Sequence, residues 1–396
     1  MIEHNFSQQD LHEIAGSKGE KLWEKKLDQL INLSPPTLKD ELWRTVSFAP
    51  KLTFEKNQVS KIAEANEVHI VDGQIASLPK NTEGLVFSTG SQALEKIISE
   101  KIPETEDYYE LLTEVACQQV LFVEILSSKE IQQTIRIKYD FSNKTSRAFL
   151  VYVKAGHHSQ ARFLETINGQ EEIESFSRAI VSLDEGAKVD WIKTHSGNHQ
   201  SHSFGSFYSK LKRNALLRHF LFHAGQEWGR EQTKVELNEE GARVESYGAY
   251  LTSGSENVQY LSEIQHKAPH TESVQLYKGI LDENSQVLFR GMIEVDQVAQ
   301  QSQSEQLNKN IVLSKKATIN TRPQLKISAD DVKCAHGATI GQLDEEQVFY
   351  LRTRGFSDES SRFLLTQGHI LEILLKIGDK DIQDKLEKQL WDQFNK

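Results

Sequence analysis

Residues 273–296, SVQLYKGILDENSQVLFRGMIEVD, contain the same short pattern twice. Tyr277-Lys-Gly-Ile in the first half aligns with Phe289-Arg-Gly-Met in the second half, so that a glycine keeps its place in each copy. A unit near twelve residues fits half a turn of a β-solenoid, in which a glycine allows a tight turn or the close approach of a neighbouring coil. Two adjacent hairpin strands of a β-sandwich would give the same pattern. The repeat therefore favours a solenoid and leaves the sandwich open.

Alternation of apolar and polar residues extends outward from this repeat through the middle of the chain. The stretches 134–139, TIRIKY, and 187–193, AKVDWIK, both alternate in this way, which is typical of half-buried strands. The alternation continues over roughly 200 residues, broken by short polar turns and by no convincing long helix. We therefore predict a mainly β core over residues 131–343.

Helical periodicity appears on both sides of the predicted core. Apolar residues recur at helical spacing between residues 8 and 32, and residues 107–127 are apolar enough for a buried helix that holds Cys117. We expect a mostly helical N-terminal region over residues 1–130. A C-terminal helical region over residues 344–396 is expected to cover an open end of the solenoid.

The C-terminal region divides into several predicted helices. Asp344 is a suitable N-cap, Gln347 would complete a capping box, and Gly355 would end this first helix. We expect a second helix to end at Gly368 and a third to follow it. The charged stretch 379–396 predicts an exposed helix at the end of the chain.

Composition excludes several classes of function. The net charge of −11 argues against nucleic acid as a main partner, because phosphate binding needs a basic surface. No apolar stretch approaches the roughly 18 residues of a membrane span, so no integral membrane segment is expected. The two cysteines, Cys117 and Cys334, lie too far apart to suggest a disulfide framework, and no secretory signal is visible. These features favour the reducing cytoplasm.

The sequence lacks the common enzyme motifs. It contains no phosphate-binding loop of the GxxxxGK[ST] type, no strand-bounded GxGxxG and no GxSxG. A histidine-rich stretch holds His195, His199 and His202, but without cysteine or HExxH it predicts a solvated turn rather than a metal site. His219 and His223, which flank an apolar triplet, are predicted to line the face of a strand.

Cys334 and His336 are the strongest candidates for chemistry. At positions i and i+2 of an extended segment, both side chains point to the same face. A thiolate and an imidazole could share iron or zinc, although two ligands are too few for a closed site. A second chain would have to supply the remaining ligands. The structural alternative is a buried cysteine beside a hydrogen-bonded histidine at the end of a strand.

Several stretches between about residues 225 and 370 closely resemble the core of the SufB/SufD family. They are HKAPH (266–270), YKGI (277–280), QVAQ (297–300), SEQLN (304–308), IVLS (311–314), Ala317, PQLKI (323–327), DVKCAHGAT (331–339) and DEEQVFYLRTRG (344–355). The Cys-x-His form followed by Gly-Ala-Thr is more similar to the SufD branch. Thr271 stands where many members have cysteine after Pro-His, so we expect no sulfur-relay role at that position.

This resemblance implies a right-handed parallel β-helix between helical end regions. It also implies a non-catalytic scaffold subunit of a complex that builds iron–sulfur clusters, with SufB paired through the β-helix and the SufC ATPase bound through the C-terminal helices. His336 and its companion Cys334 would contribute to a transient cluster shared with SufB. No cofactor is expected in the isolated chain, which could instead pair with a second copy through the edges of its sheets.

The predicted helix after Asp344 supplies the candidate docking residues. Val348, Phe349, Leu351 and Arg352 define one face of it, and aromatic and arginine side chains are favoured at interface cores. The resemblance favours an ATPase-docking surface, whereas residues of this kind could also pack the C-terminal helices on each other. Two other functions stay open, namely a β-helical polysaccharide lyase or hydrolase and a metal-free β-solenoid adaptor.

Overall fold

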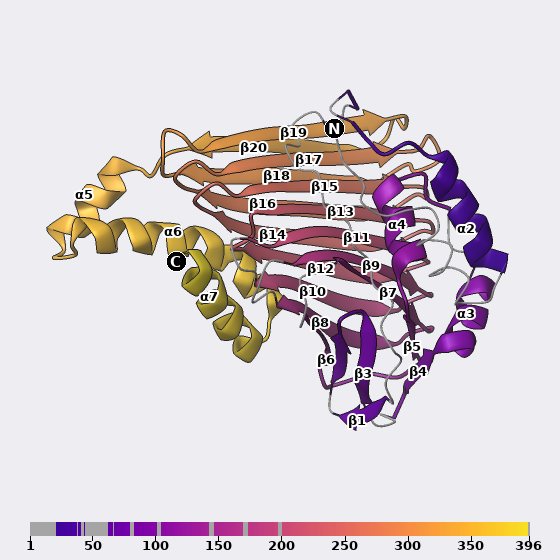
Figure 1. Cartoon of the computed structure of the whole chain (residues 1–396). Helices are drawn as coiled ribbons and strands as arrows, with labels where there is room; N and C mark the ends of the chain where they lie inside the picture. The colour runs from indigo at the N-terminus through magenta and orange to yellow at the C-terminus, as the bar shows by residue number, and fades with distance from the viewer. Residues whose placement is uncertain are drawn as a thin grey trace.

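The chain forms a parallel β-helix with helices on its two outer faces. The computed structural model describes residues 21–37, 39–40, 43, 62–65, 67–79, 83–100, 104–141, 146–168, 173–196 and 200–394. From residue 146 to residue 312, strands alternate between two sheets, so that each strand pairs with the strand two positions before it and the strand two positions after it (Figure 1). Arg243 lies beside Glu272, 29 positions further on, and this parallel register continues strand by strand. The predicted mainly β solenoid core is therefore confirmed.

Two sheets contain all the strands of the described residues. The eleven-stranded sheet holds, in spatial order, β1 (Ala63–Ala65), β3 (Gln74–Pro79), β2 (Val68–Val71), β6 (Ile135–Asp140), β8 (Gln160–Asn168), β10 (Lys188–Ser196), β12 (Leu216–Ala224), β14 (Arg243–Thr252), β16 (Glu272–Leu281), β18 (Gln303–Val312) and β20 (Lys333–Gly341). The nine-stranded sheet holds β19 (Thr318–Ile327), β17 (Gln286–Val295), β15 (Asn257–His266), β13 (Trp228–Leu237), β11 (His202–Leu211), β9 (Glu174–Leu183), β7 (Ser146–Ala155), β5 (Val120–Ile125) and β4 (Leu85–Thr89).

The sequence repeat marks two successive strands that face each other across the interior. The rings of Tyr277 in β16 and Phe289 in β17 lie with centroids 5.0 Å apart. Their spacing of twelve is shorter than a half turn, because Tyr277 is the sixth residue of its strand and Phe289 the fourth of its own. Gly279 and Gly291 both give room to a neighbouring coil, since a Cβ atom would lie 2.0 Å from the Tyr250 ring at Gly279 and 1.6 Å from Gln306 Nε2 at Gly291.

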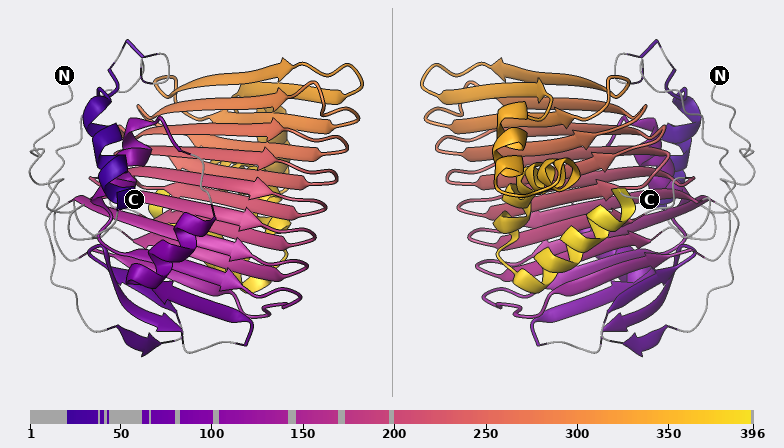
Figure 2. Two further views of the ribbon diagram at one scale, coloured as in Figure 1. Left: turned by 90° about the vertical axis from the view of Figure 1, so that its right-hand side faces the viewer. Right: turned by 90° about the vertical axis from the view of Figure 1, so that its left-hand side faces the viewer.

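Helices from the two ends of the chain cover opposite sheets (Figure 2). The N-terminal helices are α2 (Lys21–Asn32), α3 (Gly90–Ser99) and α4 (Tyr108–Ala116), and α3 and α4 pack on β5, β7 and β9 of the nine-stranded sheet. The C-terminal helices are α5 (Glu345–Thr353), α6 (Asp358–Leu374) and α7 (Lys380–Phe394), and α6 and α7 pack on β10, β12, β14 and β16 of the eleven-stranded sheet. A short 3₁₀ turn, Leu375–Ile377, separates α6 from α7.

The N-terminal region is less helical than predicted. Its described part contains strands β1–β5 in addition to α2–α4, and these strands extend both sheets of the solenoid. The helix expected over residues 107–127 ends at Ala116, and β5 follows it because 120–125, VLFVEI, is rich in β-branched and aromatic residues. The division at residues 130 and 343 stays a prediction. Residues 8–20 of the first predicted helix lie outside the described part.

Two expectations for the C-terminal helices are wrong. The helix α6 does not stop at Gly368 but continues to Leu374, because Ile370, Ile373 and Leu374 bury their side chains against the sheet. The last helix is not exposed on all sides, since Leu386, Leu390 and other apolar residues of α7 belong to the same buried cluster. Tertiary packing therefore outweighs the weak helix propensity of a single glycine.

Candidate functional site

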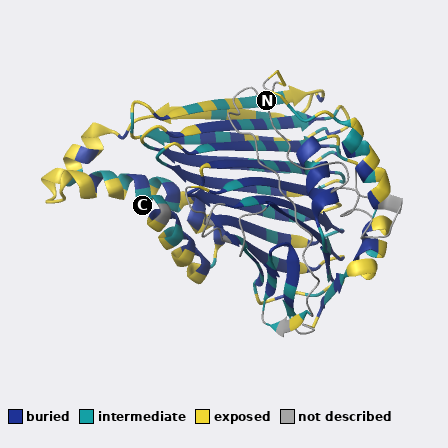
Figure 3. Cartoon of the chain, in the orientation of Figure 1, coloured by how far each residue is buried: buried dark blue, intermediate teal, exposed yellow. Residues whose placement is uncertain are grey.

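The candidate ligands lie on β20, the last strand of the solenoid. β20 pairs with β18 on one side, and no described strand pairs with its other edge. β19 occupies the same terminal position in the other sheet. Most residues of these two strands are exposed, in contrast to the buried strands beneath them (Figure 3). The solenoid thus ends in an open coil at the place where the candidate ligands lie.

Cys334 and His336 both point into the interior of this terminal coil. Cys334 packs with Ala299, Ala329 and other residues of a small apolar cluster between the sheets. His336, two positions on, lies on the same face of the strand and is exposed because no described coil lies above it. Burial raises the pKa of the Cys334 thiol. The structure therefore brings together the two residues that the sequence singled out.

A chain of hydrogen bonds lies directly beneath Cys334. In the neighbouring strands, Ser304 is the backbone partner of Cys334 and Ser273 is the partner of Ser304. The two serine hydroxyls lie 2.7 Å apart, and Ser273 Oγ lies 2.8 Å from Nε2 of His266. In the two preceding coils, Val244 and Leu217 occupy the place of Ser273. The side chains stacked at this position of successive strands are therefore apolar in the lower coils and become polar only near Cys334.

The direction of these hydrogen bonds follows from one carbonyl group. Thr271 Oγ1 donates to the carbonyl oxygen of Ala268 at 3.0 Å, so its oxygen accepts from Nδ1 of His266 at 2.8 Å. Nε2 of His266 then accepts from Ser273, which in turn accepts from Ser304. Burial lowers the pKa of His266 to about 4, which keeps the ring neutral. At the upper end of this series of hydrogen bonds, the hydroxyl oxygen of Ser304, beside Cys334, can still accept a hydrogen bond.

A second polar column lies beneath His336. Gln306 is the backbone partner of His336, and Gln275 is the partner of Gln306. Both glutamines are fully buried, and Gln306 Nε2 donates to Gln275 Oε1 at 3.2 Å. At the next inward-facing position of β18, Asn308 Nδ2 donates to the Tyr250 hydroxyl at 2.9 Å. Amide and hydroxyl groups therefore form the floor of the open coil.

The histidine-rich stretch contributes a buried charged cluster, which the sequence did not predict. His195 is fully buried at the end of β10, and its Nε2 lies 2.6 Å from Glu231 Oε1. Lys193 donates to the other carboxylate oxygen of Glu231 at 2.9 Å. The prediction of a solvated turn is therefore wrong for His195, whose place on the inner face of a strand buries it. His202 begins β11, and His199 lies outside the described residues.

His219 and His223 line the inner face of β12, as predicted. Both are fully buried, and burial lowers the pKa of each to about 3. Neither ring nitrogen of either residue has a hydrogen-bond partner among the described residues. His219 instead stacks on the ring of Phe207 with centroids 4.3 Å apart. Both imidazoles are neutral core groups.

The helix α5 projects from the body (Figure 1), and two of its aromatic side chains are exposed. Phe349 and Tyr350 are 66% and 56% exposed, whereas Val348 is 1% exposed. Val348 is a buried residue of α5, which packs against α6, and its role in docking stays a prediction. Tyr350, which the prediction placed outside the docking face, is available at the surface.

The remaining predicted docking residues are partly or largely accessible. Leu351 is half-buried and Arg352 is exposed, with a guanidinium nitrogen 3.5 Å from the Asp358 carboxylate. Asp344 caps α5 by accepting from the backbone N–H of Glu346, and no hydrogen bond from Gln347 completes a capping box among the described residues. The exposed residues of α5 include Phe349, Tyr350 and Arg352 beside the acidic residues of its first turn.

Comparison with known proteins identifies the family. The family model described as the SUF system FeS cluster assembly SufBD core domain matches residues 141–369, more than half of the chain. The chain belongs to the SufBD family.

Similarity to individual SufBD proteins varies in extent. Iron–sulfur cluster assembly protein SufD of Escherichia coli is 23% identical over 95% of this chain and 93% of its own length. An iron–sulfur cluster assembly SufBD family protein of Synechocystis is 36% identical over 52% of this chain, which covers 46% of that relative. SufD of Plasmodium falciparum is 28% identical over 55% of this chain and 15% of its own length. The chain thus spans less than half of some relatives and nearly all of another.

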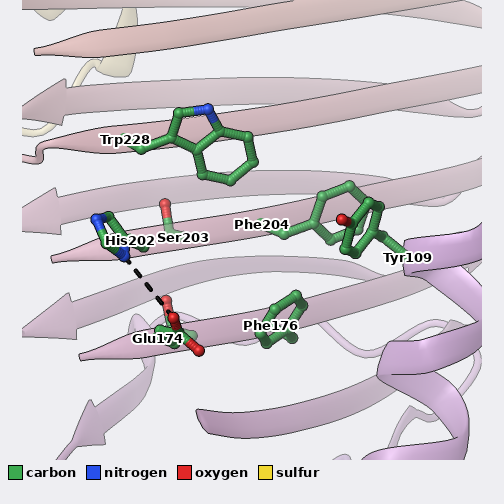
Figure 4. Close-up of a pocket in the computed structure, with 8 residues that line it drawn as sticks. Tyr109, Glu174, Phe176, His202, Ser203, Phe204 and Trp228 are labelled. Carbon is green, nitrogen blue, oxygen red and sulfur yellow. Dashed lines mark ion pairs between the residues drawn. The ribbon is translucent and has the colours of Figure 1, made fainter. Parts of the chain in front are cut away.

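This SufBD chain has a small hollow on the outer face of the nine-stranded sheet (Figure 4). His202 and Glu174 point toward each other from β11 and β9, 3.9 Å apart, while Phe176, Phe204 and Tyr109 of α4 form an aromatic wall. The hollow has a volume of about 10 Å³, which gives room for at most one water molecule. It is too small for an organic substrate.

The described residues contain no group of three or more His, Cys, Asp or Glu side chains that could hold a metal ion. Cys334 and His336 therefore belong to no such group among these residues. Two larger hollows, of about 130 and 250 Å³, lie elsewhere and fall below the usual size of ligand pockets. Among the described helices, none is both long and apolar enough to cross a membrane.

Proposed function

We propose that this chain is a SufD-like scaffold subunit that shares a nascent iron–sulfur cluster with a SufB-like subunit, while a SufC-like ATPase binds its C-terminal helices. The observation that carries this proposal is the position of Cys334 and His336, which point inward at the uncovered end of the solenoid. Sulfur and nitrogen donors suit iron. The cluster is cargo that leaves the complex, and hydrolysis of ATP belongs to the partner.

The free edges of β19 and β20 support pairing with another β-helix. Unpaired backbone groups at a sheet edge favour the addition of further strands. A second solenoid placed end to end would cover the inward-facing ligands and supply the donors that two residues lack. A homodimer would use the same edges, so SufB-like and identical partners compete for one surface.

The exposed face of α5 supports the docking of a partner distinct from the β-helix. Phe349 and Tyr350 bring aromatic area to it, and Arg352 adds a cation. Exposed aromatic residues beside arginine are typical of binding hot spots. Neither cysteine forms a disulfide, which suits a reducing cytoplasm.

Co-expression with SufB-like and SufC-like partners tests this function. We expect a complex of one SufB-like subunit, two ATPase subunits and this chain, recovered by affinity purification and measured by native mass spectrometry. A variant with three prolines placed in β19 and β20, at positions 321, 325 and 338, should lose the SufB-like subunit but keep the ATPase. Failure of the wild-type chain to bind either partner would contradict the proposal. No observation favours the polysaccharide lyase, so it is not carried further.

A further inference from the structure

Gln306 is placed to act on His336. It lies in β18 directly beside His336 of β20, and both side chains belong to the inward-facing row of their strands. Two contacts fix this direction. The Gln306 amide reaches toward Gly291 in the opposite sheet, whereas the flanking Leu307 packs toward the outer cluster that contains α6. Gln306 is 0% exposed, while His336 above it is exposed.

Among the described residues, the Gln306 carboxamide has a hydrogen-bond partner for its nitrogen and none for its oxygen. Its Nε2 donates to Gln275 Oε1 at 3.2 Å, in the coil beneath. Its Oε1 has no hydrogen-bond partner among the described residues. Because the two ends of a planar carboxamide point in different directions, an Nε2 group directed at the lower coil leaves Oε1 free toward the upper one. A buried acceptor without a partner is destabilising, so the site favours a donor from above.

The backbone of the opposite sheet keeps this arrangement in place. A Cβ atom at Gly291 would lie 1.6 Å from Gln306 Nε2, so only glycine leaves room for the carboxamide there. The donor available in the next coil is the His336 ring, which needs a proton on one nitrogen and a lone pair on the other in its neutral form.

We propose that Gln306 is a positioning residue for His336, whose ring donates one N–H to Gln306 Oε1 and turns its other nitrogen toward the open end of the solenoid. The inference deepens the proposed function and rests on it for the identity of the metal, which is the iron of the nascent cluster. Metal-binding histidines commonly donate their second ring nitrogen to a neighbouring acceptor, which fixes both tautomer and orientation. Loss of such an acceptor typically costs 10–100-fold in metal affinity.

The first test uses the full chain without metal or partner. Nitrogen-15 NMR of the histidine rings, with His336 assigned through His336→Ala, reports the tautomer of His336. We expect a single tautomer in the wild type and in Gln306→Glu, which keeps an acceptor oxygen. Gln306→Leu and Gly291→Ala should each give a mixture of tautomers, because the first removes the acceptor and the second displaces it. An unchanged single tautomer in both of these variants would overturn the proposal.

The controls separate positioning from folding. The exposed His270 ring serves as an internal reference that no variant should alter. Gly291→Ala keeps the chemistry of Gln306, and its closest contact is the flexible end of that side chain, with the Phe289 ring next at 3.1 Å, so it serves as a second variant if Gln306→Leu does not fold. A mixture of tautomers at His336 with an unchanged His270 supports positioning, whereas equal changes at both rings contradict it.

The second test uses the purified complex with its SufB-like and SufC-like partners. We expect Gln306→Leu to weaken binding of ferrous iron by 10–100-fold and Gln306→Glu to retain it. If His336→Ala abolishes cluster formation but Gln306→Leu changes neither iron affinity nor tautomer, the role of Gln306 is refuted and the proposed function stands. If Gln306→Leu changes the tautomer while His336→Ala forms clusters normally, the proposed function fails and the role of Gln306 in orienting the ring stands.

Discussion

Lys193 and Glu231 form an ion pair of 2.9 Å in the interior of the solenoid, with both side chains only 4% exposed. Lys193 comes from β10 and Glu231 from β13, so the pair joins the two sheets across the core. Burial alone would raise the pKa of Glu231, but Lys193 and His195 outweigh it and lower that pKa to about 2. The carboxylate is therefore charged, and its partners offset the cost of burying it.

We predict that Glu231→Gln lowers the free energy of unfolding by about 3–5 kcal/mol, because it leaves the Lys193 cation buried without its counter-ion. Urea denaturation at neutral pH measures this change. The matched control is Asp392→Asn, which breaks an exposed ion pair with Lys388 and should cost less than about 1 kcal/mol. Equal effects of the two substitutions would contradict the role assigned to the buried pair.

The buried histidines should make the protein sensitive to acid. Burial lowers the pKa of His219 from 6.5 to about 3, so the unfolded chain binds more protons than the folded chain at intermediate pH. Stability should therefore fall as pH drops below about 6.5 and continue to fall toward pH 3, by roughly 3 kcal/mol per histidine at pH 4. Urea denaturation at a series of pH values gives this dependence.

His219→Leu isolates the contribution of one ring. Leucine has a similar volume and removes two buried nitrogens that lack partners among the described residues. We expect the variant to be at least as stable as the wild type at pH 7 and to lose part of the decrease between pH 6.5 and pH 4. A pH dependence identical to that of the wild type would show that the His219 ring is not neutral and buried in solution.

The loss of stability on replacing a glycine by alanine should depend on the position of that glycine. Gly279→Ala should destabilise the protein by about 1–3 kcal/mol, because its Cβ atom would lie 2.0 Å from the Tyr250 ring. Gly341→Ala in β20 is the control, since a Cβ atom there meets no described atom within 4 Å and should change stability by less than about 0.5 kcal/mol. Thermal unfolding of the two variants distinguishes them, and a neutral Gly279→Ala would refute the close packing of these coils.

The exposed face of α5 predicts which substitutions affect ATPase docking. Phe349→Ala and Tyr350→Ala should each weaken binding of the SufC-like partner by more than about 1 kcal/mol while leaving the stability of this chain unchanged. Val348→Ala should act in the opposite way, lowering stability because the side chain is buried. Calorimetric titration with the partner and denaturation of the free chain measure the two effects. Unchanged partner binding in both aromatic variants would exclude this face.

The periodic parts of the fold could be predicted from the sequence. Alternation fixed the strands around Ile137 and Trp191, and the glycine repeat at Gly279 and Gly291 indicated coils in close contact. The placement of Cys334 and His336 on one face followed from the geometry of a strand. These signals are local, so a single sequence carries them.

The misjudged features depend on contacts between distant segments. The polar stretch around His195 resembles a surface turn, but His195 lies on the inner face of β10, where it contacts Glu231, 36 positions away. Val348 and Phe349 are adjacent and both apolar, and only the packing of α6 decides which of them is exposed. Gln306 lies in the stretch 304–308 that carries the family resemblance, but its place beside His336 depends on the register between β18 and β20.

The most direct test of the central claim is the yield of iron–sulfur cluster in the complex that carries His336→Ala. The complex is purified with its partners, reconstituted anaerobically with iron and sulfide, and measured by absorption and Mössbauer spectroscopy, with His270→Ala as the control for loss of an exposed histidine. We predict that His336→Ala assembles with both partners but holds no cluster, while His270→Ala matches the wild type. A normal cluster yield in His336→Ala would contradict the account.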